Sequence, residues 1–173
     1  MNTKALKRLS GTQKLALAGI YCAIAVVGST LSFPVFGSKC SPVQHLINVL
    51  CAVTLGPWWG LMVAFVSSLL RNLFGLGTLL AFPGSMCGVL LSGLLYKYSR
   101  KLPLAYLGEI VGTGIIGGLL SYPIGRYIIG IPNIGAFTFI VPFLISTGVG
   151  TLIAFIIVSA IRSRNILPAP ETL

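Results

Sequence analysis

The sequence predicts an all-α integral membrane protein, a bundle of six transmembrane helices with both the N- and the C-terminus in the cytoplasm. Three observations support this fold class. The 173-residue chain is 55% hydrophobic and only 8% charged, whereas about 25% of the residues in a soluble domain are charged. Apolar stretches follow one another along almost the whole length, so residues 1–173 are expected to form a single membrane domain. Basic residues gather between these stretches in a pattern that fixes their orientation.

The first three expected helices are separated by proline residues, which end or kink a helix. The first covers about 14–33 and stops at Pro34; we interpret it as a retained transmembrane helix rather than a cleaved signal peptide, because further spans follow it. The second covers about 43–55 and is closed by Pro57. It is shorter than the roughly 20 apolar residues that a span needs, so it should be tilted or buried among its neighbours. The third covers about 58–70.

The last three expected helices complete the bundle. They cover about 79–98, 104–122 and 134–161, with Pro123 at the end of the fifth and Pro142 inside the sixth. Several of the 21 glycines recur four residues apart, a spacing that lets helix backbones approach closely in a bilayer. Close helix packing is therefore expected at three glycine pairs: Gly84/Gly88, Gly108/Gly112 and Gly114/Gly118.

The basic residues indicate which side each end of a helix faces. With six spans, both chain ends and the connection between the fourth and fifth helices lie on one side, and three basic clusters fall there. Lysine and arginine are enriched in cytoplasmic loops, so this side should be the cytoplasm. Lys39, Arg71 and Arg126 follow the first, third and fifth helices and should lie outside. The clusters are Lys4, Lys7, Arg8 and Lys14; Lys97, Arg100 and Lys101; and Arg162 and Arg164.

Composition also excludes several classes of function. The formal charge of +10 does not indicate nucleic-acid binding, because the cations flank apolar segments where they contact lipid headgroups of the bilayer. The sequence has no GxxxxGK[ST] phosphate loop and no nucleophile-and-base motif, so we do not expect an enzyme. Any active transport would take its energy from a partner or an ion gradient. With His45 as the single histidine and only two acids, neither a metal nor a cofactor is expected.

Polar side chains open the second expected helix. Gln44 and Asn48 share one helix face, and His45 lies beside it. Polar residues within a span are costly and usually face the bundle interior or an aqueous cavity. Two interpretations remain open, a ligand contact or hydrogen bonding that only holds the helices together.

Further polar residues are expected at the same external end. Together they would surround the mouth of a site for a small polar aromatic ligand, with apolar walls and a few placed hydrogen-bonding groups. Each cation among them is equally consistent with a plain membrane-edge residue. Glu109 is expected near the cytoplasmic start of the fifth helix, paired with Arg100 or Lys101, and a proton-coupling role is a weaker alternative. The further candidates are Lys39, Arg71, Asn72, Tyr122, Arg126 and Asn133.

Four sequence segments carry a resemblance to a known family. They read KCSPVQHLIN at 39–48, GPWWG at 56–60, RNLFGLGT at 71–78 and FPG at 82–84. With six expected helices and no ATPase motif, the chain resembles the ThiW family of substrate-binding S components of energy-coupling factor (ECF) transporters. The resemblance implies an S-component-like fold in the cell membrane. It also implies a subunit that captures hydroxyethylthiazole, a precursor of thiamin, at the extracellular face.

The same resemblance implies protein partners. An S component works with a transmembrane coupling protein and two cytoplasmic ATPases, which drive uptake. In the family, the coupling contact uses a small-xxx-small motif on the first helix. The best match here is Gly19 with Ala23, with Ala16 one turn before them, and Ala18 with Cys22 is a competing register.

Two alternatives stay open at this stage. The chain could be an S component for another small heterocycle or vitamin. Hydroxyethylthiazole is neutral, whereas the expected mouth holds three cations and no acid, so a phosphorylated or carboxylated ligand would match the charge better. An alternative of a different class is a stand-alone holin-like channel or a structural membrane protein.

Overall fold

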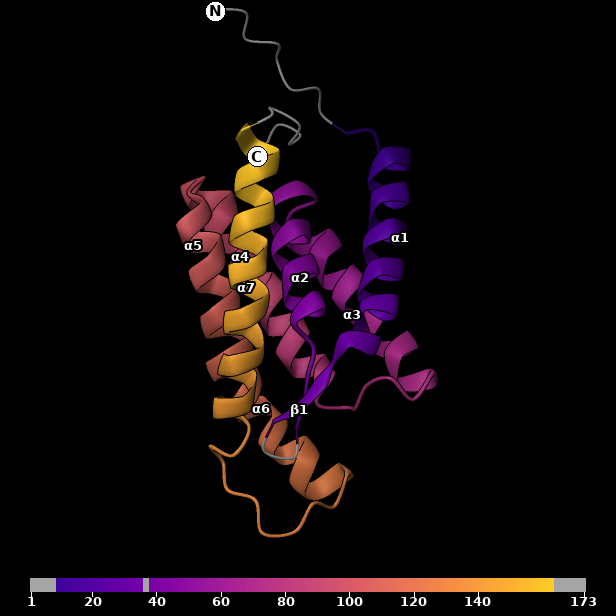
Figure 1. Cartoon of the computed structure of the whole chain (residues 1–173), viewed down its shortest axis with the longest axis vertical. Helices are drawn as coiled ribbons and strands as arrows, with labels where there is room; N and C mark the ends of the chain where they lie inside the picture. Colours follow the sequence, from indigo (N-terminus) through magenta and orange to yellow (C-terminus); the bar gives the residue numbers. More distant parts are fainter. Residues whose placement is uncertain (1–8, 36–37, 164–173) are drawn as a thin grey trace, which may run out of the picture.

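A computed structural model describes residues 9–35 and 38–163 of the chain. It shows a bundle of six helices capped at one end by a β-hairpin, which confirms the predicted fold class (Figure 1). The fifth helix is one continuous rod, Leu102–Ile128, in which α-helical and π-helical segments alternate. The elements are α1 (Gly11–Gly28), η1 (Ser29–Leu31), β1 (Phe33–Val35), β2 (Ser38–Cys40), α2 (Pro42–Thr54), α3 (Pro57–Leu73), α4 (Ala81–Ser99), then α5 (Leu102–Glu109), η2 (Ile110–Gly117), α6 (Gly118–Pro123) and η3 (Ile124–Ile128) of the fifth helix, and α7 (Ile140–Ser163).

The helices differ in their suitability to cross a membrane. Within the described residues, three segments are long and apolar enough to span it: Gly11–Leu31, Leu102–Ile128 and Ile140–Ile161. The apolar helix α2 is shorter and lies in the middle of the bundle, with every residue buried except Val43 and Leu46. The expectation that this short helix is buried among its neighbours is therefore confirmed.

The first helix ends earlier than predicted. The range 14–33 is wrong at its end, because α1 stops at Gly28 and a 3₁₀ turn leads into an antiparallel hairpin that pairs Pro34 with Lys39. The side chains of Ser29 and Thr30 donate to carbonyls of the preceding turn, which favours termination there. Proline fits this hairpin because a two-stranded ladder leaves each strand with a free edge that needs no N–H donor.

The connections alternate between the two ends of the bundle, as six spans require. The start of α1, the end of α7 and the α4–α5 turn lie at one end, and the hairpin and segment 129–139 lie at the other (Figure 1). Lys39 and Arg126 consequently lie at the hairpin end. Which end faces the cytoplasm stays a prediction. Of the clustered cations, Lys4, Lys7, Arg8 and Arg164 lie outside the described residues.

The fifth helix does not end at Pro123 as predicted. It continues through a π-helical segment to Ile128, where the N–H of Ile129 donates to the carbonyl of Ile124 at 2.9 Å. Wider π-helical turns re-satisfy backbone groups around a proline in a membrane helix, so this proline does not stop the helix. The sixth helix in turn begins at Ile140 rather than near 134, which places Pro142 in its first turn, where a missing N–H costs little.

Glycines set the close approach of α4 to the fifth helix, as their spacing predicted. A methyl group added at Gly117 would come within 2.6 Å of the Cα atom of Gly84. One added at Gly112 would come within 2.6 Å of the carbonyl oxygen of Cys87. Only glycine allows backbones this close. This close contact between α4 and the fifth helix places polar groups of both helices against α2.

Candidate ligand-binding site

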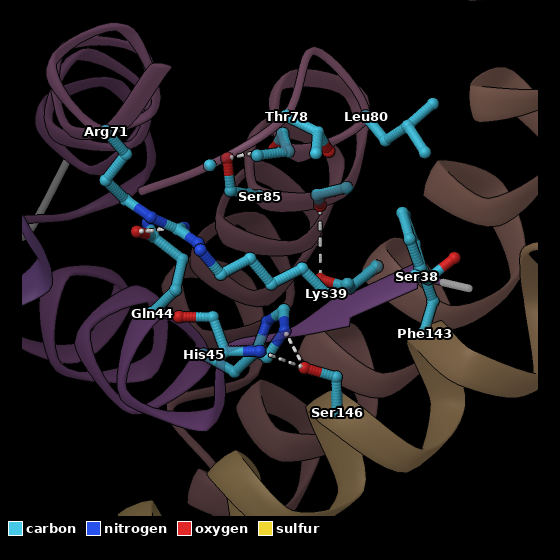
Figure 2. A pocket seen from close by; sticks show the side chains of 15 residues that line it. Ser38, Lys39, Gln44, His45, Arg71, Thr78, Leu80, Ser85, Phe143 and Ser146 are labelled. Atoms are coloured by element: carbon cyan, nitrogen blue, oxygen red, sulfur yellow. Dashed lines mark hydrogen bonds between the residues drawn. The ribbon is translucent and has the colours of Figure 1, made fainter. Parts of the chain in front are cut away.

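A pocket opens at the hairpin end of the bundle (Figure 2). Its empty space, counted with the open mouth, is about 510 Å³. The walls come from the hairpin, α2, the end of α3, the start of α4, the fifth helix and α7. The lining side chains combine a few apolar groups with many polar ones: Ser38, Lys39, Ser41, Gln44, His45, Arg71, Thr78, Leu80, Ala81, Ser85, Thr113, Phe143 and Ser146.

Arg71 enters the pocket from the last turn of α3. Gly75 has a φ of +70°, which turns the chain back so that the N–H groups of Leu76 and Gly77 both donate to the carbonyl of Arg71. This ends the helix at Leu73, two residues after Arg71. The Arg71 side chain is 3% exposed, and its Nη1 donates to Oε1 of Gln44 at 3.1 Å.

Gln44 ties α2 to α3. Its Nε2 donates to Oγ of Ser67 and to Oδ1 of Asn48, both at 3.2 Å, while its Oε1 accepts from Arg71. Pro42 at the start of α2 suits the first helical turn, where its missing N–H has no role. The helix therefore begins early enough to place Gln44 in its first turn, facing α3.

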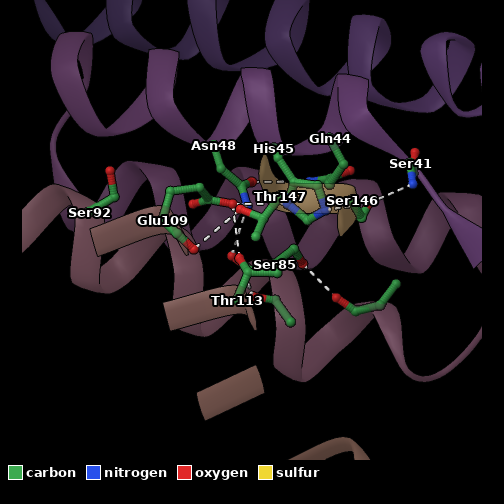
Figure 3. A network of polar contacts seen from close by, with 12 residues as sticks. Ser41, Gln44, His45, Asn48, Ser85, Ser92, Glu109, Thr113, Ser146 and Thr147 are labelled. Carbon is green, nitrogen blue, oxygen red and sulfur yellow. Dashed lines mark hydrogen bonds and ion pairs between the residues drawn. The ribbon is translucent and has the colours of Figure 1, made fainter. Parts of the chain in front are cut away.

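His45 links three helices through its ring nitrogens (Figure 3). Nδ1 lies 3.0 Å from Oε1 of Glu109 on the fifth helix, and Nε2 lies 3.0 Å from Oγ of Ser146 on α7. The backbone N–H of Ser41 also donates to this Ser146 oxygen at 2.9 Å. With Nδ1 as donor to the carboxylate, Nε2 accepts the Ser146 hydroxyl proton, so the ring is held at both ends.

Glu109 lies in the interior, and its expected pairing with Arg100 or Lys101 is wrong. Its side chain is fully buried, and Oε1 accepts from His45, from Nδ2 of Asn48 at 2.9 Å and from Oγ1 of Thr113 at 2.9 Å. The fifth helix begins at Leu102, so Glu109 lies about 10 Å along the helix axis from that loop. Its carboxylate therefore anchors the network beneath the pocket.

Several buried polar atoms around the pocket have no hydrogen-bond partner in the described part of the chain. Oγ of Ser38, Oγ of Ser41 and Nε of Arg71 belong to lining residues. Oε2 of Glu109 is the free oxygen of the network beneath. Buried polar groups are nearly always paired in native proteins, and unpaired ones are costly. Unused donors that line one pocket indicate a place for a ligand.

The predicted site residues divide into two groups. Lys39, Gln44, His45 and Arg71 line the pocket, and Asn48 lies next to it in the network of Glu109. The other four do not line it. Asn72 instead donates to the carbonyls of Ser68 and Thr78 at 2.8 and 3.1 Å, and so braces the α3–α4 connection. A ligand contact by this second group stays a prediction without support from the pocket: Asn72, Tyr122, Arg126 and Asn133.

Sequence reasoning missed the contributions of the other helices. Ser85 of α4, Thr113 of the fifth helix and Ser146 of α7 all line the pocket. Each is a hydroxyl within an apolar segment, and the rule that polar residues in a span face the interior applies to them as it does to α2. Hydroxyls also bond to their own helix backbone, however, so that rule alone does not single them out. No group of three His, Cys, Asp or Glu that could hold a metal occurs among the described residues.

The small residues of α1 face away from the bundle. Ala16, Gly19 and Ala23 are exposed on one side of the helix, and a methyl group added at Gly19 would meet nothing within 4 Å. Ala18 is buried and Cys22 half-buried, so the competing register faces the other helices. The open face defined by Ala16, Gly19 and Ala23 is called the small-residue face below.

Comparison with known proteins identifies the family. The family described as "Thiamine-precursor transporter protein (ThiW)" matches residues 15–164 of the sequence. The chain belongs to the ThiW family. The matched range contains every residue of the pocket, and this ThiW-family chain is an integral protein of the cell membrane.

The fold of this ThiW-family chain resembles that of a solved structure described as "Structure and mechanism of the S component of a bacterial ECF transporter". The TM-score is 0.75, the sequence identity is 20%, and the match covers 89% of this chain and 98% of the other. The six-helix bundle is therefore the S-component fold. Among curated proteins, none matches the chain.

Proposed function

We propose that this chain is the substrate-binding S subunit of an ECF-type transporter, and that it captures hydroxyethylthiazole at the extracellular face of the membrane. The observation that carries the proposal is the pocket at the hairpin end, whose lining holds three buried donor atoms without a partner among the described residues: Oγ of Ser38, Oγ of Ser41 and Nε of Arg71. Membership in a thiamine-precursor transporter family supports the class of ligand. It also favours an S component over a stand-alone channel.

The pocket offers what a small heterocycle needs. Leu80 and Phe143 supply apolar surface for a ring, while the serine hydroxyls and the Arg71 guanidinium supply hydrogen-bond donors. Ring nitrogens and hydroxyl oxygens accept such bonds. Tight binding requires that the polar groups are already in place, and the bonds from Gln44 to Arg71 and from Ser146 to His45 hold them.

The energy for uptake would come from partner subunits. We propose that the small-residue face of α1 contacts a transmembrane coupling protein, which two cytoplasmic ATPases drive. Small residues let helices pack closely in a bilayer, and this face is open in the isolated chain. Toppling of the bundle in the membrane would then carry the occupied pocket toward the cytoplasm.

Binding to the purified, detergent-solubilised chain tests the substrate. Hydroxyethylthiazole should bind with submicromolar affinity, and His45→Ala should weaken this binding because it removes the link between α2, Glu109 and Ser146. Arg126→Ala is the matched control, since Arg126 is exposed at the same end but does not line the pocket. Thermal unfolding of each variant shows whether it still folds. Tight binding of an unrelated heterocycle, with none of any thiazole, would exclude the substrate but not the fold.

A further inference from the structure

We propose that the pocket selects an anionic ligand, a thiazole-type heterocycle bearing a carboxylate or a phosphate monoester, whose anionic oxygens contact Arg71 and Lys39. The inference rests on the proposed function, because it specifies the ligand of the same pocket. It predicts that such anionic derivatives bind more tightly than neutral hydroxyethylthiazole.

The first observation is a buried cation that lacks a counter-charge. Arg71 is 3% exposed, lines the pocket and extends from α3 toward Lys39 in Figure 2. Its Nη1 is bonded to the neutral amide of Gln44, its Nε has no partner, and it forms no ion pair with any described residue. A buried charge is costly unless it is paired. An anion in the pocket supplies that pairing.

The second observation is that the acidic side chain of Glu109 is bonded outside the pocket. Glu109 is the single acidic residue in the described part of the chain, and it does not line the pocket. Its Oε1 is taken by three donors, from His45, Asn48 and Thr113. The carboxylate therefore compensates the network beneath the pocket, while Lys39 and Arg71 stay uncompensated among the lining residues.

The third observation is the number of donors. Ser38 and Ser41 are buried, line the same pocket and have hydroxyls without partners, so they add two donors to those of Arg71 and Lys39. A neutral thiazole alcohol offers few acceptors, essentially one ring nitrogen and one hydroxyl. Carboxylate and phosphate groups offer two or three oxygens, and hydrogen bonds to ionised acceptors are about twice as strong as neutral ones. The donor set matches an oxyanion group better than an alcohol.

The test compares three ligands on the full-length chain in lipid nanodiscs by isothermal titration calorimetry. They are hydroxyethylthiazole, its phosphate ester and a thiazole carboxylate of matched size. At least one anionic ligand should bind about 10- to 100-fold more tightly than the neutral alcohol, as expected for charge-assisted bonds at a buried cation. The order of the two anions distinguishes a phosphate from a carboxylate as the recognised group.

Variants assign the preference to the pocket. Lys39→Gln and Arg71→Gln should each weaken binding of the anion by about 10-fold or more, and should weaken binding of the alcohol by a clearly smaller factor, because the alcohol can lose only a neutral hydrogen bond at these positions. Lys39 is exposed, so its variant remains informative if Arg71→Gln fails to fold. Arg126→Gln removes an equal charge at the same end, outside the lining, and should change neither affinity.

Three results would contradict the inference. If hydroxyethylthiazole binds as tightly as both anions, the anion preference is wrong and the proposed function stands. If no thiazole binds, the proposed substrate fails, and the inference fails with it. If Arg126→Gln lowers the affinity for the anion as much as Lys39→Gln does, the preference comes from general surface charge and not from this pocket.

Discussion

The neighbouring helices α1 and α2 differ in how much of their surface the protein itself covers. In α2 every residue except Val43 and Leu46 is buried, whereas in α1 only Ala18 and Ala25 are. The polar side chains of α2 bond to α3, α4, the fifth helix and α7. The small-residue face of α1 is exposed, and a methyl group added at Gly19 would meet nothing within 4 Å. The proposed ligand capture and the proposed partner contact thus involve two different helices that pack against each other.

The contact between these helices is itself specific. A methyl group at Gly28, the last residue of α1, would collide with the side chain of Val43 in the first turn of α2. At the other end of α2, the hydroxyl of Tyr21 lies 3.2 Å from Oγ1 of Thr54. Both contacts lie on the side of α1 that faces α2. A substitution on its outer face should therefore leave the pocket intact, which makes the two roles separable by experiment.

The largest effect is expected on transport. Gly19→Leu or Ala23→Leu places a bulky side chain on the small-residue face and should abolish uptake in cells that also express the coupling protein and ATPases. Ligand binding to the purified variants should stay unchanged, because the added side chain at Gly19 has free space in the isolated chain. Leu15→Ala, at an exposed position of the same helix outside the motif, is the control. Normal uptake by both leucine variants would show that the coupling contact lies elsewhere.

The next effect concerns the buried acid beneath the pocket. Glu109→Ala leaves donors of His45, Asn48 and Thr113 without an acceptor, so we expect a loss of about 3–5 kcal/mol in stability together with loss of ligand binding. Thermal unfolding in detergent measures the first, and calorimetry the second. Glu109→Gln keeps an acceptor oxygen and should retain more stability than Glu109→Ala. Equal stability of the wild type and Glu109→Ala would show that the network does not hold the bundle.

A smaller effect is expected at the close glycine contact between α4 and the fifth helix. A Cβ atom at Gly88 would collide with Oγ1 of Thr113 and come within 2.7 Å of Oε2 of Glu109. Gly88→Ala should therefore cost about 1–3 kcal/mol in stability and weaken binding, because overpacking displaces the carboxylate. Gly19→Ala is the matched change on open helix surface and should be neutral or slightly stabilising. Equal thermal stability of the two variants would contradict this account of the contact.

The contrast between Gly19 and Gly88 shows what the sequence predicts and what it leaves open. Gly19 and Gly88 both follow small-xxx-small spacing, and the spacing indicates helix packing without saying whether the partner lies inside the chain or outside it. Similarly, the inward stripe of Gln44, His45 and Asn48 could be predicted, because a polar group in a span has few favourable places. Helix periodicity and membrane energetics are local properties that the sequence shows directly.

The remaining features depend on distant partners. Pro34 and Pro123 look alike as helix breakers, yet one lies in a hairpin and the other within a continuous helix, because π-helical turns around Pro123 keep its backbone bonded. Sequence proximity predicts that Glu109 pairs with Arg100 or Lys101, whereas its partner in the structure, His45, is 64 residues away. Arg71 and Arg126 have equivalent positions in the sequence pattern, each after a helix at the same end of the bundle, and this pattern does not reveal that only Arg71 lines the pocket.

The smallest expected effect tests the seam between α1 and α2. Tyr21→Phe removes the hydroxyl that contacts Thr54 while keeping the ring, and Thr54 retains its own bond to the carbonyl of Leu50. We therefore expect a loss of about 0.5–1.5 kcal/mol in stability, as for one ordinary hydrogen bond. Tyr127→Phe, which removes an exposed hydroxyl, should have no effect. Ligand affinity should not change in either variant, because Thr54 lies at the opposite end of α2 from Gln44 and His45. A large loss of affinity in Tyr21→Phe would show instead that α1 and the pocket are coupled through this seam, and that the two helices do not have separate roles.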